Sequence, residues 1–340
     1  MRVEIAQFDS GEAAAGGFDG FYELMVACLK ADNPGAREPG REAVEAGLAA
    51  SAGSGAVLVW TARAQDGRLA GMADVHLPQG EDEQAAGVAA VRVSVDPALR
   101  RRGIGTELLR AVLPSLRERG YGRMVAQGLT SGGAGEAFAV AVGGAVVHRN
   151  VTQRLDVSAV DAQLWQVPTP VGYHTLRWRG AAPEDLVESF VRSRAAVDDA
   201  PRGEQTRTLP DWTVRRLREQ EAVFRERSCD YFVVAACAQP GDVVGFTEIL
   251  VHPNAPTMGL QQYTAVLPEH RGHGLGRAVK AEMMRWILGA GTEIATVTTS
   301  TAAANVPMQR VNAQLGYATL RGVAVVEGDV ARVASYVSVP

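Results

Sequence analysis

Two copies of an Arg-x-x-Gly-x-Gly motif, Arg100–Gly105 and Arg271–Gly276, are the residues of this sequence best suited to chemistry. Each motif is expected to lie between a β-strand rich in branched side chains and an amphipathic helix. Glycines allow the backbone to approach a ligand closely, and the first turn of a helix presents unpaired N–H groups at the positive end of its dipole. Such a loop is suited to bind an anion, and a pyrophosphate in particular.

The two motifs belong to a longer internal repeat. Val95–Gly105 aligns without a gap on Val266–Gly276, with identical valine, proline, arginine and both glycines. Upstream, Val57–Leu77 resembles Tyr231–Val251, and each segment is typical of a strand, a tight turn and a second strand. Two matching blocks in the same order at nearly the same offset predict the duplication of a whole domain, since the period is far too long for a solenoid repeat.

The alternation of strand and helix patterns in each half predicts a mixed α/β sheet with helices on both faces. We therefore expect an N-terminal domain over residues 1–158, a proline-containing linker over 159–170 and a C-terminal domain over 171–340. The expected elements include a helix over Arg41–Ala50 and two closing strands, Thr319–Val326 and Val330–Val339.

Composition and charge argue against several classes of protein. The formal net charge is −4, so the chain lacks the basic excess with which proteins neutralise nucleic acid or anionic lipid. Cys28, Cys229 and Cys237 form no Cys-x-x-Cys pair, which argues against a disulfide framework and a zinc site. The longest apolar run, Phe138–Val147, is half of the ~20 residues that a spanning helix needs, and the N-terminus does not resemble a signal peptide. We expect a soluble, cytoplasmic protein with no metal and no nucleic-acid or membrane partner.

With their flanks, the two motifs resemble the acetyl-CoA signature of the GNAT superfamily, Q/R-x-x-G-x-G/A. The first copy follows Val93-Ser-Val-Asp-Pro and the second follows Ala265-Val-Leu-Pro. Asn305–Tyr317, with the pattern Asn-x-x-Met-x-x-Val-Asn-x-x-Leu-Gly-Tyr, is similar to a later helix of that superfamily. A Rossmann site would need Gly-x-Gly-x-x-Gly and an acid about 20 residues further on, which neither copy supplies. The chain thus resembles a tandem GNAT N-acetyltransferase of actinobacterial type, with an architecture similar to that of mycothiol synthase.

This resemblance implies acetyl-CoA, or another acyl-CoA, as the acyl donor. In the superfamily the pantetheine arm lies along the strand before the glycine loop, and the loop holds the pyrophosphate. Asn305 matches the position that steadies this arm, although an asparagine there also suits a helix N-cap. The implied contacts are Thr264, Ala265, Val266, Arg271, Gly272, His273, Gly274, Leu275, Gly276, Arg277 and Asn305 in the C-terminal half, and Val93, Ser94, Val95, Arg101, Arg102, Gly103, Ile104, Gly105 and Thr106 in the N-terminal half.

The C-terminal half is expected to be catalytic, because the N-terminal half lacks a counterpart of Asn305 and of the Leu-Gly-Tyr ending. Glu248 is the candidate general base, since alternation along its strand places it on one face with Phe246 and Leu250; a carboxylate that pairs across an exposed face is the alternative. Asn312 stands where the superfamily usually carries the tyrosine that protonates the leaving thiolate. Tyr263, on the strand next to the thioester, is the candidate substitute. Tyr317 is the alternative, although it stands at the superfamily's core aromatic position.

Asp198 and Asp199 fall between the first two helices of the C-terminal half, where they would suit a cationic acceptor or form an acidic surface turn. We expect an acyl-CoA-dependent N-acyltransferase that acts on the amine of a small molecule, in a setting such as antibiotic metabolism or self-resistance. A mycothiol synthase-like acetyltransferase and a non-catalytic acyl-CoA-binding module are the alternatives. The acceptor, the acyl chain and the oligomeric state stay open.

Overall fold

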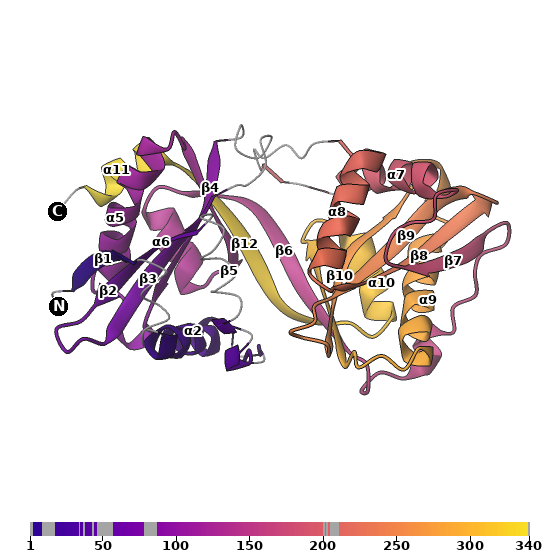
Figure 1. Ribbon diagram of the computed structural model, residues 1–340, viewed down its shortest axis with the longest axis horizontal. Helices are drawn as coiled ribbons and strands as arrows, with labels where there is room; N and C mark the ends of the chain where they lie inside the picture. The colour runs from indigo at the N-terminus through magenta and orange to yellow at the C-terminus, as the bar shows by residue number, and fades with distance from the viewer. Residues whose placement is uncertain are drawn as a thin grey trace. The chain divides into compact units, whose positions relative to one another are not determined.

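The computed structural model describes residues 3–8, 18–33, 35–36, 38–42, 44–45, 57–77, 87–199, 201, 203–204 and 211–338. The helix expected over Arg41–Ala50 lies largely outside these residues. The chain forms two compact units, each with a mixed sheet and helices, as the sequence patterns predict (Figure 1). Unit 1 comprises Met1–Arg149, Gly203–Thr208 and Gly322–Pro340, and unit 2 comprises Asn150–Arg202 and Leu209–Arg321.

The sheet of unit 1 has the strand order β1-β2-β3-β4-β5-β12, in which β4 and β5 run parallel and the other neighbours run antiparallel. Helix α5 buries Leu108, Val112 and Leu116, spaced four residues apart, against one face of the sheet, and α2 packs on Leu69 and Met72. The elements are β1 (Glu4–Phe8), α2 (Phe18–Asp32), β2 (Val57–Arg63), β3 (Leu69–His76), β4 (Val88–Val95), α5 (Ile104–Glu118), β5 (Arg123–Thr130), α6 (Ala134–Ala141), β12 (Ala318–Asp329) and α11 (Val330–Val337).

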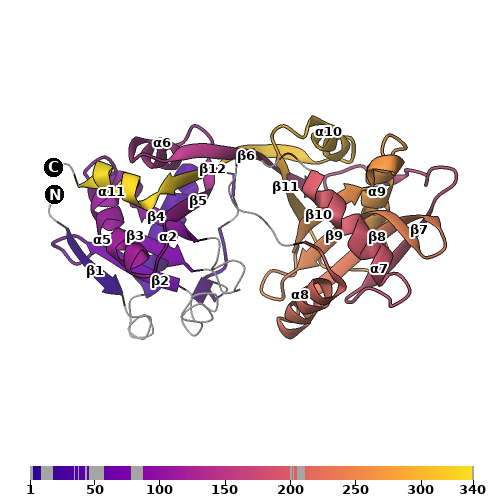
Figure 2. The ribbon, with the colours of Figure 1, turned by 90° about the horizontal axis from the view of Figure 1, so that it is seen from above.

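The sheet of unit 2 has the order β6-β11-β10-β9-β8-β7, with β10 and β11 parallel. Its central strands β8 and β9 are buried on both faces, with α9 and α10 on one side and α7 and α8 on the other (Figure 2). The elements are β6 (Ala145–Asp156), β7 (His174–Arg179), α7 (Val187–Ala195), α8 (Val214–Glu226), β8 (Asp230–Gln239), β9 (Asp242–Val251), β10 (Met258–Val266), α9 (Leu275–Gly289), β11 (Thr296–Ala302) and α10 (Val306–Gln314).

Each unit takes one sheet strand from the other half of the sequence. In unit 2, Asn150–Asp156 of β6 pairs with β11, and in unit 1, Val323–Asp329 of β12 pairs with β5. The predicted boundary at residues 159–170 would keep β6 in the N-terminal domain and β12 in the C-terminal domain, whereas these segments of the two strands fold in the opposite units. We call β6 and β12 the closing strands of the two halves. Because the halves are duplicates, the two closing strands fit equivalent sheet edges, and such an exchange costs little free energy.

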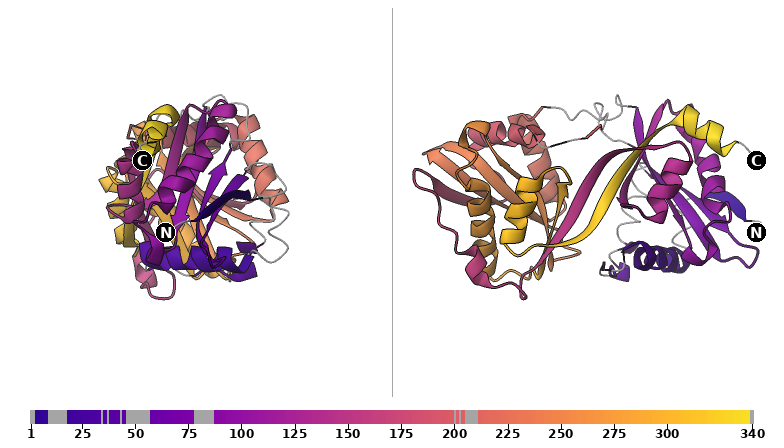
Figure 3. Two further views of the ribbon diagram at one scale, coloured as in Figure 1. Left: turned by 90° about the vertical axis from the view of Figure 1, so that its left-hand side faces the viewer. Right: turned by 180° about the vertical axis from the view of Figure 1, so that it is seen from behind.

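The predicted strand Val330–Val339 is wrong, because residues Val330–Val337 form helix α11. Asp329 caps this helix by accepting a hydrogen bond from the backbone N–H of Arg332. Its buried residues, Val330, Val333, Ala334 and Val337, follow the spacing of one helix face and join the core of unit 1 beside α5 (Figure 3). The apolar alternation in Val-Ala-Arg-Val-Ala-Ser-Tyr-Val fits both a helix and a strand, and the tertiary contact with α5 favours the helix.

The segment predicted as a linker packs into the core of unit 2. Trp165, in the short 3₁₀ turn Ala162–Trp165, is 1% exposed, and its Nε1 donates to the carbonyl oxygen of Leu315 at 2.9 Å. Asp161 begins that turn by accepting from the N–H of Gln163. No helix among the described residues is long and apolar enough to cross a membrane.

Candidate active site

A divergence between β10 and β11 creates the candidate site of unit 2. The two strands pair only from Met258 to Gln261, whereas β10 continues beside β9 as far as Val266. Gln262 and Tyr263 fall at the irregularity of the β9 register and belong to neither ladder. The backbone groups of β10 beyond Gln261 that face away from β9 are not paired with β11, and an extended ligand rich in amides would suit them.

The loop after β10 presents backbone N–H groups to the same site. Gly272 and Gly274 have φ of 81° and 83°, a conformation that only glycine adopts at little cost. Gly274 is the N-cap of α9 and supplies no side-chain cap. The first N–H groups of α9 are thus left for a ligand, and an anion is the ligand that they favour.

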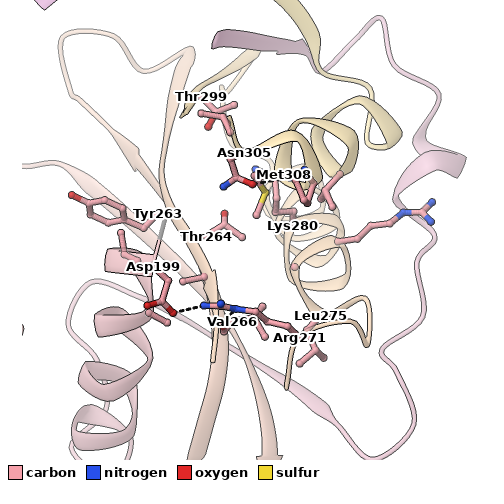
Figure 4. A pocket seen from close by; sticks show the side chains of 18 of the residues that line it. Asp199, Tyr263, Thr264, Val266, Arg271, Leu275, Lys280, Thr299, Asn305 and Met308 are labelled. Atoms are coloured by element: carbon pink, nitrogen blue, oxygen red, sulfur yellow. Dashed lines mark hydrogen bonds and ion pairs between the residues drawn. The ribbon is translucent and has the colours of Figure 1, made fainter. Parts of the chain in front are cut away.

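These features border a cavity of about 760 Å³ (Figure 4). His273, Asp198 and Glu248, which the sequence analysis predicted as site residues, are not among its lining residues. The predicted residues that do line it are Asp199, Tyr263, Thr264, Ala265, Val266, Arg271, Gly272, Gly274, Leu275, Gly276, Arg277 and Asn305.

In both units the side chain of the motif arginine bonds to other residues of the protein. In unit 2 the Nε of Arg271 donates to the carbonyl oxygen of Val266 at 3.0 Å, and its other end pairs with Asp199 (Figure 4). In unit 1 Arg100 makes the same bond to its strand end, at 3.1 Å, and a bidentate ion pair of 2.7 Å with Asp32. The arginine therefore ties the glycine loop to the preceding strand and to a carboxylate. Arg271 also lines the cavity, so its predicted contact with the cofactor stays a prediction.

The side chain of Arg277 is better placed than that of Arg271 to contact a ligand in the cavity. It lies in the first turn of α9 and lines the cavity, and its Nε is buried without a hydrogen-bond partner among the described residues. A buried donor of this kind normally has a partner, so its place in the cavity fits an anionic ligand. Asn305 combines both predicted roles, because it lines the cavity while its Oδ1 accepts from the N–H of Met308 at 3.2 Å as the N-cap of α10.

Glu248 has the predicted burial but not the predicted surroundings. Its carboxylate, 1% exposed, is ion-paired with the fully buried Arg194 and accepts from the hydroxyl of Tyr231 at 2.6 Å. Burial raises the pKa of the Glu248 carboxyl, and Arg194 and Tyr231 act in the opposite direction. The pattern around Glu248 does not reveal Arg194, because this partner comes from α7, 54 residues away in the chain.

Tyr263 lies at the cavity on the α7 side of β10. Its ring is 6.5 Å from that of Trp212 in an edge contact, and the guanidinium of Arg194 lies 5.5 Å from its centre. Figure 4 shows Tyr263 and Lys280 on opposite sides of β10. Asn312 is fully buried away from the lining, where its Nδ2 donates to Gln153 at 2.9 Å.

Lys280 is the site residue that sequence reasoning missed. It lines the cavity at 2% exposure, and its Nζ donates to the Oε1 of Gln261 at 3.0 Å. Burial lowers its pKa to about 7. The available signal was its spacing from Met283, Met284 and Ile287, which places a lysine on the apolar face of its helix.

Unit 1 contains a smaller version of the site. β4 pairs with β5 only over Val88–Ala90, and Gly103 repeats the φ of 83°. The cavity has a volume of about 340 Å³, and Phe138 packs against the helix start so closely that a Cβ on Gly105 would lie 3.2 Å from its ring. The predicted residue Arg102 is outside the lining, which contains the predicted Val93, Ser94, Val95, Arg101, Gly103, Ile104, Gly105 and Thr106. No group of metal-ligating side chains occurs among the described residues of either unit.

Comparison with known proteins matches both units to one family. Residues 19–134 and 196–317 match the acetyltransferase (GNAT) family. The mycothiol acetyltransferase of Rhodococcus jostii is 27% identical over 235 residues, which cover 66% of this chain and 68% of that protein. The enzyme of the same name from Thermomonospora curvata is 33% identical over 217 residues, covering 63% and 64%.

Solved structures extend the likeness over the whole chain. A tandem GNAT protein from the clavulanic acid biosynthesis pathway, solved without AcCoA, is 25% identical with a TM-score of 0.70, and the match covers 97% of this chain and 99% of that one. A GCN5-related N-acetyltransferase from Sphaerobacter thermophilus shares the fold at 16% identity, with a TM-score of 0.70 and 96% of each chain covered.

Proposed function

This chain belongs to the acetyltransferase (GNAT) family and is an N-acetyltransferase, and from this premise we propose that unit 2 transfers the acyl group of acetyl-CoA, or of another acyl-CoA, to the amine of a small molecule. The observation that carries this proposal is the cavity between the diverging β10 and β11, which ends at the glycine loop of α9.

The residues of this cavity fit the parts of an acyl-CoA. The N–H groups from Gly272 to Gly276 and the unpartnered Nε of Arg277 suit the phosphates. The backbone of β10 from Gln262 to Val266, which has no β11 partner, suits the amides of a pantetheine arm. Acyl-CoA would supply the thioester when bound, and the acceptor would attack its carbonyl carbon as a neutral amine.

The protein's contribution to the reaction follows from these groups. The backbone N–H group of Gln262, at the irregularity of β10, is a donor suited to polarise the thioester carbonyl. Pre-oriented donors of this kind contribute about 2.7–4 kcal/mol each to other acyl-transfer reactions. The cavity wall formed by Tyr263, Asp199 and Val197 lies on the side of α7, and this side suits the acceptor.

We assign catalysis to unit 2 because its cavity has a volume of about 760 Å³, against about 340 Å³ in unit 1, where Phe138 packs against the start of α5. Gly274→Val and Gly103→Val form a matched pair, since both positions have a φ of 83° and no atom within 4 Å of a new Cβ. Each substitution costs about 1–2 kcal/mol of backbone strain. Gly274→Val should abolish acyl-CoA binding and turnover, and Gly103→Val should keep most of both.

The test combines acyl-CoA binding by calorimetry with thiol release in the presence of a panel of small amines. Loss of turnover in a folded Gly103→Val variant would overturn the assignment to unit 2. Acyl-CoA binding by the wild-type protein without thiol release from any amine, and without acetylated products in an unbiased mass-spectrometric search of cell metabolites, would favour a binding module.

Two classes of amine are candidates for the acceptor. The tandem protein of the clavulanic acid pathway, which matches over the whole chain, favours an amine of antibiotic metabolism. The mycothiol acetyltransferases, at 27–33% identity over about two thirds of their length, favour the acceptor of those enzymes. Turnover with the acceptor of mycothiol acetyltransferases, at a kcat/KM above that of the other amines, would select the second candidate.

A further inference from the structure

Lys280 is a buried cation at the cavity that the proposed function leaves without a role. One amide oxygen, that of Gln261, accepts from its Nζ, and the ring centre of Tyr317 lies 4.9 Å away. An ammonium group forms three hydrogen bonds in water, so this site replaces its hydration only in part. Such burial favours the neutral amine unless a negative charge arrives.

The surroundings of Lys280 supply no such charge. Desolvation alone shifts its pKa, to about 7, and no carboxylate of the described residues forms an ion pair with its Nζ. The hydroxyl of Tyr317 donates to the same oxygen of Gln261 at 3.2 Å, and burial raises the pKa of Tyr317, which keeps this phenol neutral. The other charged or titratable side chains of the cavity lining are Asp199, Tyr263, His270, Arg271 and Arg277.

The internal repeat shows that the fold does not need this lysine. Lys280 lies four residues after Gly276, and the residue four positions after Gly105 in unit 1 is Leu109, which is 1% exposed in the core. The sequence also contains only two lysines, Lys30 and Lys280, among 34 basic residues. Arginine cannot release its proton in a protein and lysine can, so a lysine at a position built for leucine points to proton transfer.

Lys280 also lies at the end of the cavity where the reactive part of the donor belongs. The glycine loop and the α9 N-terminus define the phosphate end. The opposite end is the point where β10 and β11 rejoin, at the pair Gln261 and Thr299. The hydrogen bond of 3.0 Å to Gln261 holds the amine of Lys280 at that point, on the α9 side of the sheet.

Resting on the proposed function of unit 2, we propose that Lys280 is the catalytic proton donor to the sulfur of coenzyme A. The acceptor nitrogen forms the C–N bond, the C–S bond breaks with its electron pair on sulfur, and Nζ of Lys280 gives that sulfur a proton. The acceptor nitrogen releases one proton to solvent, and the neutral Lys280 takes one up, which balances the reaction. The proton transfer is well matched, because an ordinary thiol titrates near 8.5.

The other titratable groups of the cavity are less suited to this step. Asp199 is held by Arg271, and the two arginines cannot donate a proton. His270 lies in the glycine loop at the phosphate end, where its Nδ1 is 3.0 Å from the hydroxyl of Tyr173. Tyr263 lies on the other side of β10, toward the proposed acceptor.

Lys280→Leu is the sharpest variant, because unit 1 shows that the fold accepts leucine at this position. Lys280→Arg keeps the charge but cannot transfer its proton, and Lys30→Arg, at a position outside the cavity lining, is the control. Both Lys280 variants should lose kcat by about 10²–10⁴-fold with an unchanged Kd for acyl-CoA. The wild-type kcat should fall on the alkaline side as Lys280 loses its proton, and this limb should vanish in both variants, whereas Lys30→Arg should match the wild type.

The titration of Lys280 can be read without turnover. Labelling with ¹³C,¹⁵N-lysine gives two side-chain signals, which Lys30→Arg assigns. The Lys280 signal of the free protein should titrate near pH 7. A Lys280 signal that does not titrate between about pH 6 and 8 would overturn the inference.

The kinetic outcomes separate this inference from the function on which it rests. Wild-type kcat in a folded Lys280→Leu variant overturns the proton-donor role and leaves the acyltransferase function in place. A loss of acyl-CoA affinity as large as the loss of kcat would assign Lys280 to binding an anionic part of the donor, and would also overturn it. Absence of thiol release by the wild-type protein would instead remove the proposed function, while the lysine titration would still be measurable.

Discussion

The buried ion pair of Arg194 and Glu248 yields a prediction that separates a structural role of Glu248 from a catalytic one. Arg194 is 0% exposed and Glu248 1%, and both lie beside Tyr231. Glu248→Gln leaves the guanidinium without an anion, and an arginine cannot neutralise itself. Breaking a buried pair in this way costs about 3–5 kcal/mol of unfolding free energy. The melting temperature of unit 2 should therefore fall by roughly 6–20 °C at neutral pH.

Arg194→Met should respond differently to pH, because the remaining carboxyl can bind a proton. Burial raises the pKa of Glu248, and removing Arg194 removes the charge that opposes this shift. A carboxyl with a raised folded-state pKa destabilises the protein at neutral pH, and the penalty disappears as the pH falls through that pKa toward the ordinary value. The loss of stability in Arg194→Met should therefore shrink in acid, and that in Glu248→Gln should persist. The double variant Arg194→Met/Glu248→Leu should recover most of the stability, since an apolar pair needs no counter-charge.

Urea denaturation followed by tryptophan fluorescence, with kcat measured on the same preparations, completes this cycle. Unit 2 contains the reporters Trp178 and Trp212 close to the ion pair, since Trp178 packs on Phe190 and Trp212 on Arg194. The reasoning would be refuted by a Glu248→Gln variant of wild-type stability that loses kcat together with the acidic limb of its pH–rate profile. That result would return Glu248 to the general-base role that the sequence pattern suggested.

Three further predictions concern stability. Burial lowers the pKa of Lys280 in the folded protein to about 7, below its ordinary 10.5, so the cost of burying its charge is fully present below pH 7 and is relieved as the pH rises toward 10.5. Urea denaturation should therefore show the unfolding free energy of the wild type rising by a few kcal/mol relative to Lys280→Leu over that range. Equal pH dependence of the two unfolding free energies would contradict the burial argument. Trp165→Ala should lower the unfolding free energy of unit 2 by about 3–5 kcal/mol, because this residue of the expected linker is buried and hydrogen-bonded to Leu315. A decrease under about 1 kcal/mol would mean that the segment is a linker that does not pack on the core. Val333→Asp places a carboxylate on the buried face of α11, so it should lower the melting temperature of unit 1 and leave acyl-CoA binding by unit 2 intact. An unchanged melting temperature would contradict the contact of α11 with α5.

The duplication and the fold class could be predicted from the sequence because their signals are local. The glycine motifs fix a backbone conformation, and Gly103 and Gly274 both have the φ of 83° that such loops need. The exchange of β6 and β12 between the units could not be predicted, because both closing strands carry patterns that fit either sheet edge. The choice between them depends on the path of the whole chain, which no local pattern records.

The parts of the site formed by backbone groups could be predicted from the sequence. The parts formed by side chains from distant segments could be predicted less well. The contacts along β10 and the α9 loop follow from the motif, and most of them line the cavity. The burial of Glu248 agrees with its apolar strand, whereas its partner Arg194 could not be predicted because it comes from another element. The general-base role of Glu248 stays a prediction. Lys280 was missed because a lysine in an amphipathic helix is usually exposed, and its position on the apolar face becomes significant only beside the cavity.

Comparison of the two units separates the requirements of the fold from those of the chemistry. The arginine that ties the loop to a carboxylate occurs in both units, as Arg100 with Asp32 and Arg271 with Asp199, although the cavity beside it is about 760 Å³ in unit 2 and about 340 Å³ in unit 1. A feature shared by both units is explained by the loop conformation itself, so the ion pair needs no catalytic role. The opposite reasoning applies to Lys280, because the fold of unit 1 is complete with a leucine at that position. A buried lysine at this position, in the unit with the larger cavity, therefore supports the proposed role of Lys280 as proton donor.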